Sequence, residues 1–108
     1  AKAMLNLNID DYLKPNDVVL DQIYIAQPEH YRAGMNNFYA SVLRDLKPGL
    51  NCLLLHAAYD NAEMQAVTID HPDYGAAWRQ ADFDFFTSET CRKLLKEQNI
   101  QLVTWREI

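Results

Sequence analysis

A short apolar run that ends in a histidine limits the possible folds of this chain more than any other segment. Residues 50–56 read Leu-Asn-Cys-Leu-Leu-Leu-His, so most apolar side chains follow one another instead of alternating with polar ones. Such a run is typical of a parallel strand that is covered on both faces. Parallel strands need crossover connections, usually helical, so the run predicts an α/β fold.

The segment before this run predicts a strand and then a helix. Residues 18–26 are rich in β-branched side chains and predict a strand, which Pro28 ends. One helix is then predicted from Pro28 to the Lys-Pro-Gly sequence at residues 47–49. Strand, helix and strand in this order form a βαβ unit with parallel pairing. The helix is predicted from large apolar side chains that recur every three or four residues: Tyr31, Met35, Phe38, Tyr39, Val42, Leu43 and Leu46.

A long loop is predicted to follow the histidine. Residues 57–75 are rich in Asp, Asn and Pro, with one helical turn expected near residues 62–66. Loops of this length after a buried strand are often functional.

The last third of the chain predicts two helices and a closing strand. Residues 76–86 predict the first helix, and Thr87 or Ser88 can cap the second. Asn99 is predicted to end the second helix. Residues 100–105 are rich in strand-forming side chains and predict the strand that closes the chain.

Two or three parallel strands are too few to form a stable sheet alone. An apolar central strand needs helices on both sides or further strands beside it, and an exposed edge invites association. Residues 1–108 are therefore interpreted as a single α/β region. We expect it to be either a fragment of a larger sheet or barrel, or a chain that buries its open edge in a homo-oligomer.

Composition and charge exclude several classes of partner. A length of 108 residues is typical of a single domain. The share of hydrophobic residues, 49%, and of charged residues, 23%, is that of a globular protein. A net charge of −5 disfavours nucleic acid and anionic membrane surfaces. No apolar run is long enough to cross a bilayer, and the first eight residues lack the apolar region of a signal peptide.

Cys52 and Cys91 form no Cys-x-x-Cys motif and are predicted to serve in packing.

His56 is the first candidate for chemistry. It ends the predicted strand, at the edge where α/β folds place their ligand crevices. Its imidazole can exchange protons near neutral pH, although a ring hydrogen-bonded under the following loop would explain the position equally well. Asp60 could orient His56 or contact a polar ligand, but aspartates also simply make turns.

Other polar and aromatic groups offer weaker signals. Arg79 lies near Asp82 and Asp84, which predicts either a solvated helical pair or a guanidinium that recognises a carboxylate or hydroxyl group. Residues 70–73 carry two aspartates and a histidine without a known metal-ligand spacing, so an exposed loop explains them better. Four aromatic side chains could stack on a sugar, but such clusters more often form a core: Trp78, Phe83, Phe85 and Phe86.

Three segments together carry a resemblance to a known family. They are Leu-Leu-Leu-His-Ala-Ala-Tyr-Asp at residues 53–60, the stretch at 71–88 that contains Trp-Arg-Gln-Ala-Asp-Phe, and Ile-Gln-Leu-Val-Thr-Trp-Arg-Glu-Ile at 100–108. In order and spacing they resemble the C-terminal part of the YdjC-like, or ChbG/HpnK, carbohydrate deacetylases. The resemblance covers residues 17–108, and Ala57 stands where the family has a proline after the histidine.

This resemblance implies that the chain forms the C-terminal β/α units of a larger TIM-like (β/α) barrel. It also implies the activity of that family, whose members use a divalent metal to remove acetyl groups from N-acetylated amino sugars or oligosaccharides. Within it, His56 becomes the candidate general acid that protonates the leaving amine, and Arg79 helps to hold the site together.

The same resemblance places the divalent metal, Zn or Mg, on Asp and His ligands of the N-terminal half of the family domain. We therefore expect residues 1–108 alone to bind no metal and to be inactive. The expected partner of this segment is the missing N-terminal half of the barrel. The alternative is a non-enzymatic α/β interaction domain that forms oligomers through its open sheet edge.

Overall fold

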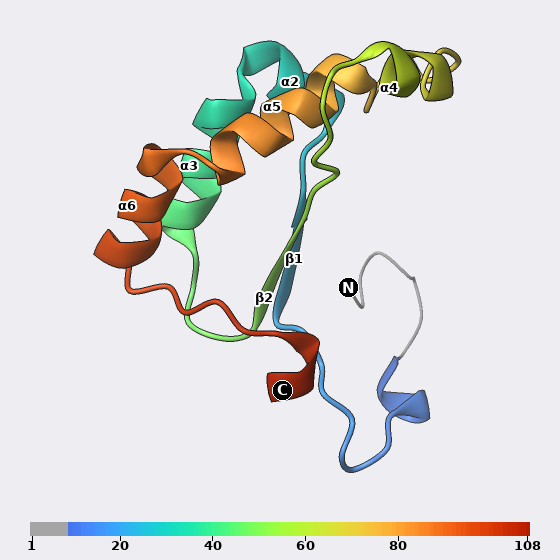
Figure 1. Ribbon diagram of the computed structural model, residues 1–108. Coiled ribbons are helices and arrows are strands. Elements are labelled where there is room, and N and C mark those ends of the chain that lie inside the picture. Colours follow the sequence, from blue (N-terminus) through green and yellow to red (C-terminus); the bar gives the residue numbers. More distant parts are fainter. Residues whose placement is uncertain (1–8) are drawn as a thin grey trace.

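The computed structural model describes residues 9–108 as a mixed α/β arrangement with a two-stranded parallel sheet and five α-helices (Figure 1). The first eight residues, which lack a signal-peptide pattern, lie outside the described part. Between residues 9 and 108, no helix is long and apolar enough to span a membrane. The elements in chain order are η1 (Ile9–Tyr12), β1 (Gln22–Ile25), α2 (Pro28–Ala33), α3 (Met35–Asp45), β2 (Asn51–Leu54), α4 (Ala62–Val67), α5 (Ala76–Phe86), α6 (Glu89–Glu97) and η2 (Trp105–Glu107).

Strands β1 and β2 pair in parallel, which confirms the predicted βαβ unit. The register runs from Gln22 opposite Asn51 to Ile25 opposite Leu54. Strand β1 is shorter than the predicted range of 18–26. Its partner β2 begins only at Asn51, after the turn at Pro48 and Gly49, so the residues before β1 have no paired strand beside them. Helices α2, α3, α5 and α6 lie on one side of the two strands (Figure 1).

The predicted helix between Pro28 and residue 46 is divided in two at Gly34. This glycine adopts φ +112°, and its N–H donates to the carbonyl of Tyr31 at 3.2 Å, so it ends α2 and begins α3. Glycine populates positive φ readily because it has no Cβ. The apolar stripe continues across the break, which is why spacing alone predicts one helix.

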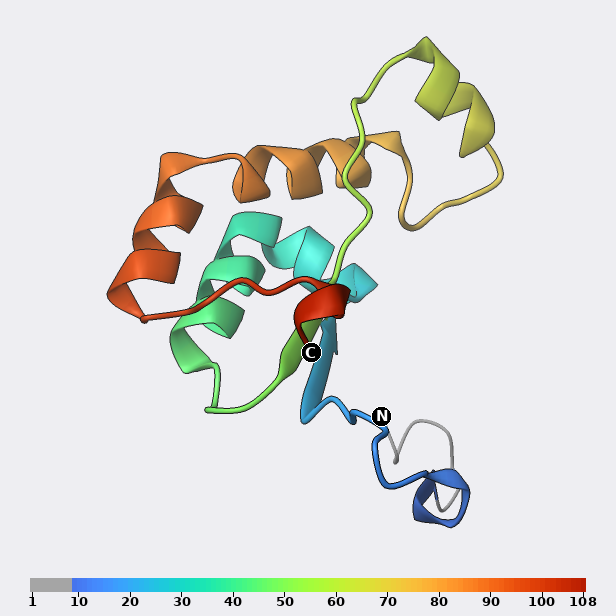
Figure 2. The ribbon, with the colours of Figure 1, turned by 60° about the horizontal axis from the view of Figure 1, so that its bottom comes forward.

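The helices of the second half match the predictions more closely. Helix α5 has the predicted range, and α4 forms within the long loop and stands apart from the other helices (Figure 2). The side chain of Ser88 caps α6 by accepting from the N–H of Cys91 at 3.1 Å. Asn99 follows α6 with φ +53°, as expected of a residue that ends a helix.

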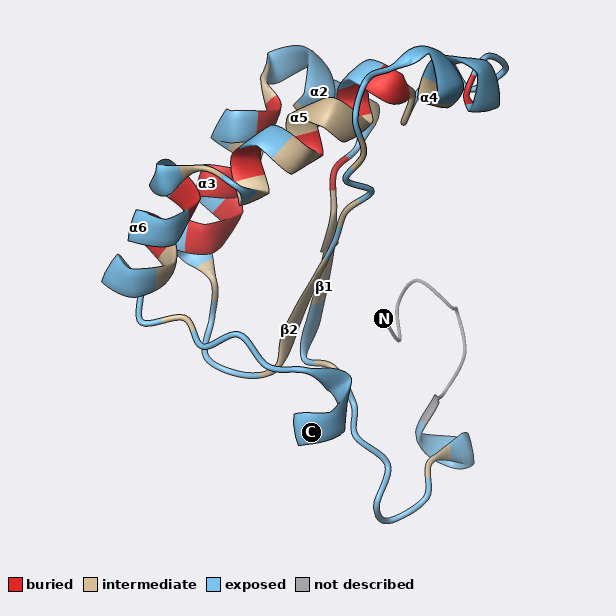
Figure 3. Ribbon diagram, in the orientation of Figure 1, coloured by how far each residue is buried: buried red, intermediate tan, exposed pale blue. Residues whose placement is uncertain are grey.

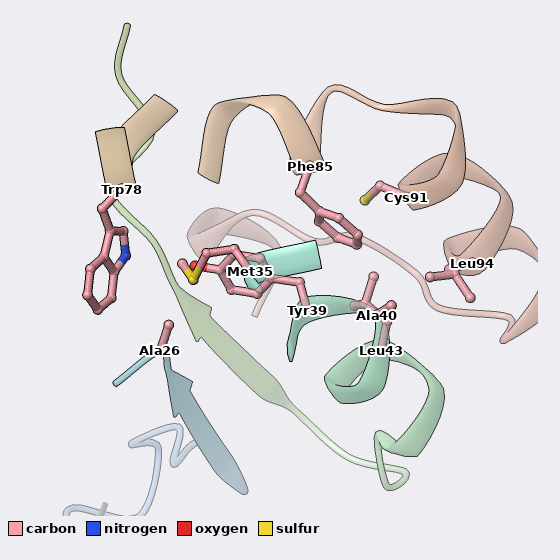
Figure 4. Packing of buried hydrophobic residues seen from close by; sticks show 9 residues of the cluster. All are labelled: Ala26, Met35, Tyr39, Ala40, Leu43, Trp78, Phe85, Cys91 and Leu94. Atoms are coloured by element: carbon pink, nitrogen blue, oxygen red, sulfur yellow. The ribbon is translucent and has the colours of Figure 1, made fainter. Parts of the chain in front are cut away.

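The hydrophobic core lies mainly between α3, α5 and α6 (Figure 4). Trp78 and Phe85 are buried, so the aromatic cluster of α5 contributes to the core as expected. Cys91 is a buried free thiol whose pKa is raised by burial, and Cys52 is a half-buried free thiol. The core is made of Ala26, Met35, Tyr39, Ala40, Leu43, Trp78, Phe85, Cys91 and Leu94.

The predicted closing strand over residues 100–105 is wrong for this structure. Residues 100–104 have no regular secondary structure, and the short helix η2 follows them. A strand exists only when a neighbour supplies N–H and C=O partners, and none of the described segments does so here. Leu102 and Trp105 are 75% and 71% exposed, so this segment lies largely in solvent (Figure 3).

The sheet is covered on one face only, which corrects the prediction for residues 50–56. Leu53 packs against the core, so strand alternation turns Cys52 and Leu54 to the opposite face, together with Ile23 and Ile25. Leu54 is 45% exposed. On the helical side, an apolar groove of about 1050 Å³ remains between the sheet, α3, α6 and the C-terminal segment. The strands therefore have the side chains of a buried sheet, but only one of their two faces is covered.

Candidate functional site

His56 lies two residues beyond the end of β2, at the carboxyl edge of the sheet where the sequence places it. Its main-chain N–H donates to Oδ2 of Asp82 at 3.0 Å. Its side chain is exposed, and its ring meets the ring of Tyr74 edge-on with centroids 5.8 Å apart. Among the described residues the imidazole has no hydrogen-bond partner, so the ring is not held under the following loop. It is free to contact a ligand.

Asp82 is a fully buried carboxylate, which corrects its expected place in a solvated pair with Arg79. Its exposed fraction is 0%, and its Oδ1 accepts a hydrogen bond of 2.6 Å from the hydroxyl of Tyr39. Burial and this hydrogen bond raise the pKa of Tyr39 above its ordinary value of 10.0, so its phenol stays protonated and donates. A sequence signal existed: Trp78, Asp82 and Phe85 share one helical stripe, and both aromatic members are core residues.

Arg79 is half-buried and holds the loop before its own helix. Its Nε donates to the carbonyl of Tyr74 at 2.7 Å, and its own carbonyl accepts from the N–H of Ala58 at 3.1 Å. In the described part of the chain it forms no ion pair with either aspartate of α5, and Asp84 instead accepts from Nε2 of Gln80 at 2.8 Å. The guanidinium therefore holds the chain at Tyr74, just before α5.

Asp60 is exposed and is held by polar contacts of its own. Its Oδ1 accepts from Nε2 of Gln65 at 2.8 Å, and its N–H donates to Oε1 of Gln80 at 2.8 Å. Within residues 9–108 it forms no hydrogen bond with the ring of His56. Next to it, Asn61 caps α4. These contacts are those of a turn residue, and its carboxylate remains open to a ligand.

Tyr74 joins His56 to the core and was not singled out by the sequence. Its ring stacks on Trp78 at 4.1 Å, and Trp78 stacks on Tyr31 at 4.9 Å. Its hydroxyl donates to the carbonyl of Ala26 at 2.6 Å, just beyond β1. Tyr74 has φ +60°, a conformation that side chains other than glycine adopt less often. Its position thus ties the end of β1 to the wall beside His56.

The described residues contain no group of three His, Cys, Asp or Glu side chains that could hold a metal ion. The polar loop at residues 70–73 is exposed, and Nδ1 of His71 contacts the carbonyl of Asp73 at 2.9 Å.

Comparison with known proteins does not narrow the function, because no family model and no curated protein matches this chain. The groups at the site themselves indicate its chemistry. An exposed imidazole can transfer a proton, and Asp60 offers a carboxylate to a polar ligand. An imidazole in this setting is suited to acid–base work.

Proposed function

We propose that this chain is the C-terminal part of a TIM-like barrel, and that the complete barrel is a metal-dependent carbohydrate deacetylase. It would remove acetyl groups from N-acetylated amino sugars or oligosaccharides. The observation that supports this most strongly is the exposed imidazole of His56 at the carboxyl edge of a parallel sheet. Active sites of β/α barrels lie at this edge.

His56 suits one step of amide hydrolysis. When the C–N bond of an N-acetyl group breaks, the amine nitrogen leaves with an electron pair and must take up a proton. A protonated imidazole at His56 would donate that proton and become neutral. A divalent metal such as Zn or Mg, held by ligands outside residues 1–108, would polarise the acetyl carbonyl and activate water.

The uncovered face of the sheet also supports a larger barrel. On this face, Leu54 at the end of β2 is 45% exposed. In a barrel, the face that carries Ile23, Ile25, Cys52 and Leu54 would point inward, where branched apolar side chains fill the interior.

The test measures acetate release from an N-acetylated chito-oligosaccharide with added Zn²⁺ or Mg²⁺. We expect release by the protein expressed from its complete reading frame and none by residues 1–108 alone. His56→Ala in the longer protein should lower the rate by about 10²- to 10⁴-fold, as for loss of a general acid. His71→Ala is the matched control, because His71 is also an exposed histidine and it contacts the carbonyl of Asp73 instead of His56.

Two results would contradict the proposal. One is acetate release by the 108-residue chain alone, and the other is an unchanged rate after His56→Ala. A reading frame that starts near Ala1 would also rule out a larger barrel encoded in the same chain.

A second function is supported by the apolar groove and the exposed C-terminal segment. Leu102, Val103 and Trp105 are exposed beside that groove, and such patches often mark interfaces. The chain would then be a non-enzymatic interaction domain that forms a homo-oligomer. Analytical ultracentrifugation distinguishes the two: a stable dimer of a complete protein that releases no acetate would favour this function.

A further inference from the structure

We propose that helix α5 acts as a clamp on the segment 56–60, and that Asp82 is the positioning residue that fixes where His56 is presented. The clamp is argued from geometry alone. Its importance for catalysis rests on the proposed deacetylase function.

The clamp is a row of hydrogen bonds from alternate residues. In an extended chain, alternate N–H groups point to the same side, as they do toward a neighbouring strand. The segment beyond β2 has no neighbouring strand in the described structure, and it runs past α5 instead (Figure 1). Three acceptors on α5 take the place of that strand: Asp82 Oδ2 for His56 N–H at 3.0 Å, Arg79 O for Ala58 N–H at 3.1 Å, and Gln80 Oε1 for Asp60 N–H at 2.8 Å.

Asp82 differs from the other two acceptors because its side chain is buried in the core. Its carboxylate is fully buried, and each of its oxygens accepts one hydrogen bond. Tyr39 on α3 holds Oδ1, so the carboxylate cannot turn without losing a buried partner. The backbone of His56 is thereby placed relative to the packed α3–α5 pair, while the imidazole stays exposed.

A purely structural role makes a different prediction from a positioning role. If Asp82 only stabilises the core, its loss will weaken all hydrogen bonds of the region together. If it positions His56, the N–H of His56 will lose protection selectively. Hydrogen exchange followed by NMR in the 108-residue chain separates the two, with the N–H of Leu53 in β2 as the internal reference.

Three variants test the hydrogen bond between the N–H of His56 and Asp82. Asp82→Ala removes it, and we expect exchange at His56 to accelerate by about tenfold relative to Leu53. Tyr39→Phe keeps the acceptor of His56 and should change that ratio by less than about twofold. Asp82→Asn retains an oxygen for His56 and an amide that can donate to Tyr39, so it should restore protection. Equal acceleration at His56 and Leu53 in Asp82→Ala would overturn the proposal.

The asparagine variant keeps the test decisive if Asp82→Ala fails to fold. A neutral amide oxygen is a weaker acceptor than a carboxylate, so the amide proton of His56 should move upfield in Asp82→Asn while that of Leu53 stays in place. An unchanged His56 resonance would mean that the carboxylate does not hold this N–H, and would refute the clamp.

Kinetics of the complete protein then separate the clamp from the proposed activity. Asp82→Ala should lower kcat by about tenfold or more with little change in KM, because a displaced acid affects the chemical step, and Asp82→Asn should recover most of kcat. Selective exchange at His56 in a protein that releases no acetate would retain the clamp and refute the deacetylase. An active protein in which Asp82→Ala alters neither exchange nor kcat would do the reverse.

Discussion

The helical layer and the two-stranded sheet use similar apolar side chains under different conditions. Helices α3, α5 and α6 bury their large residues against one another, and each helix satisfies its own backbone hydrogen bonds. The strands and the segment after α6 instead leave Leu54, Leu102 and Trp105 substantially exposed. A helix can complete its structure with local partners, whereas a strand depends on neighbours. The difference indicates that the helical layer supplies most of the buried apolar contacts of this chain, whereas the strands and the C-terminal segment leave apolar side chains exposed.

The largest effect should come from the helical core. Phe85→Ala removes a buried ring and should lower the free energy of unfolding by about 3–5 kcal/mol. The matched variant Leu102→Ala, in the exposed C-terminal segment, should change it by less than about 0.5 kcal/mol. Urea unfolding followed by circular dichroism measures both. Similar losses in the two variants would show that the C-terminal segment is packed as tightly as the core.

A smaller loss is expected at the buried contact between Tyr39 and Asp82. Tyr39→Phe leaves the carboxylate without one of its two partners, which should lower the free energy of unfolding by about 1–3 kcal/mol. Tyr31→Phe is the control on the neighbouring helix, because Tyr31 is exposed and its ring still stacks on Trp78. An equal effect of the two variants in urea unfolding would argue against a special role for the buried pair.

The smallest effect is a dependence on alkaline pH. Below pH 10, Tyr39 is protonated in both the folded and the unfolded chain and contributes no pH dependence. Above it, the unfolded chain loses this proton while the folded chain keeps it, so stability should fall by up to about 1.4 kcal/mol per pH unit. Urea midpoints between about pH 8 and 11 give the slope. Tyr39→Phe should show a shallower decline, and parallel slopes would contradict the raised pKa.

Local patterns in the sequence predicted the helices well, because their determinants lie within each segment. The range of α5, the turn that becomes α4 and the cap at Ser88 follow from nearby side chains. Gly34 was visible too, but a stripe that continues through it favours one helix over two. The strand expected at residues 100–105 could not be predicted correctly from its side chains alone, since pairing depends on another segment.

The sequence predicted the place of His56 but not the buried carboxylate of Asp82 that binds its main-chain N–H. His56 lies where the end of an apolar strand indicates, because the carboxyl edge of the sheet is fixed by the direction of β2. A solvated helical pair was one of two interpretations of Arg79 beside Asp82 and Asp84, because oppositely charged neighbours along a helix often pair in solvent. The burial of Asp82 depends on Tyr39, which is 43 residues away in sequence. Only its spacing from Trp78 and Phe85 hinted at this contact.

The two tryptophans give each region its own optical reporter. Trp78, 3% exposed, lies between two tyrosine rings, so its fluorescence should be blue-shifted and shielded from soluble quenchers such as acrylamide. Trp105, 71% exposed, should emit at longer wavelength and be quenched readily. Binding of a partner over the C-terminal segment would shield Trp105 and leave the emission of Trp78 unchanged. The covering of the C-terminal segment could thus be followed without any added label.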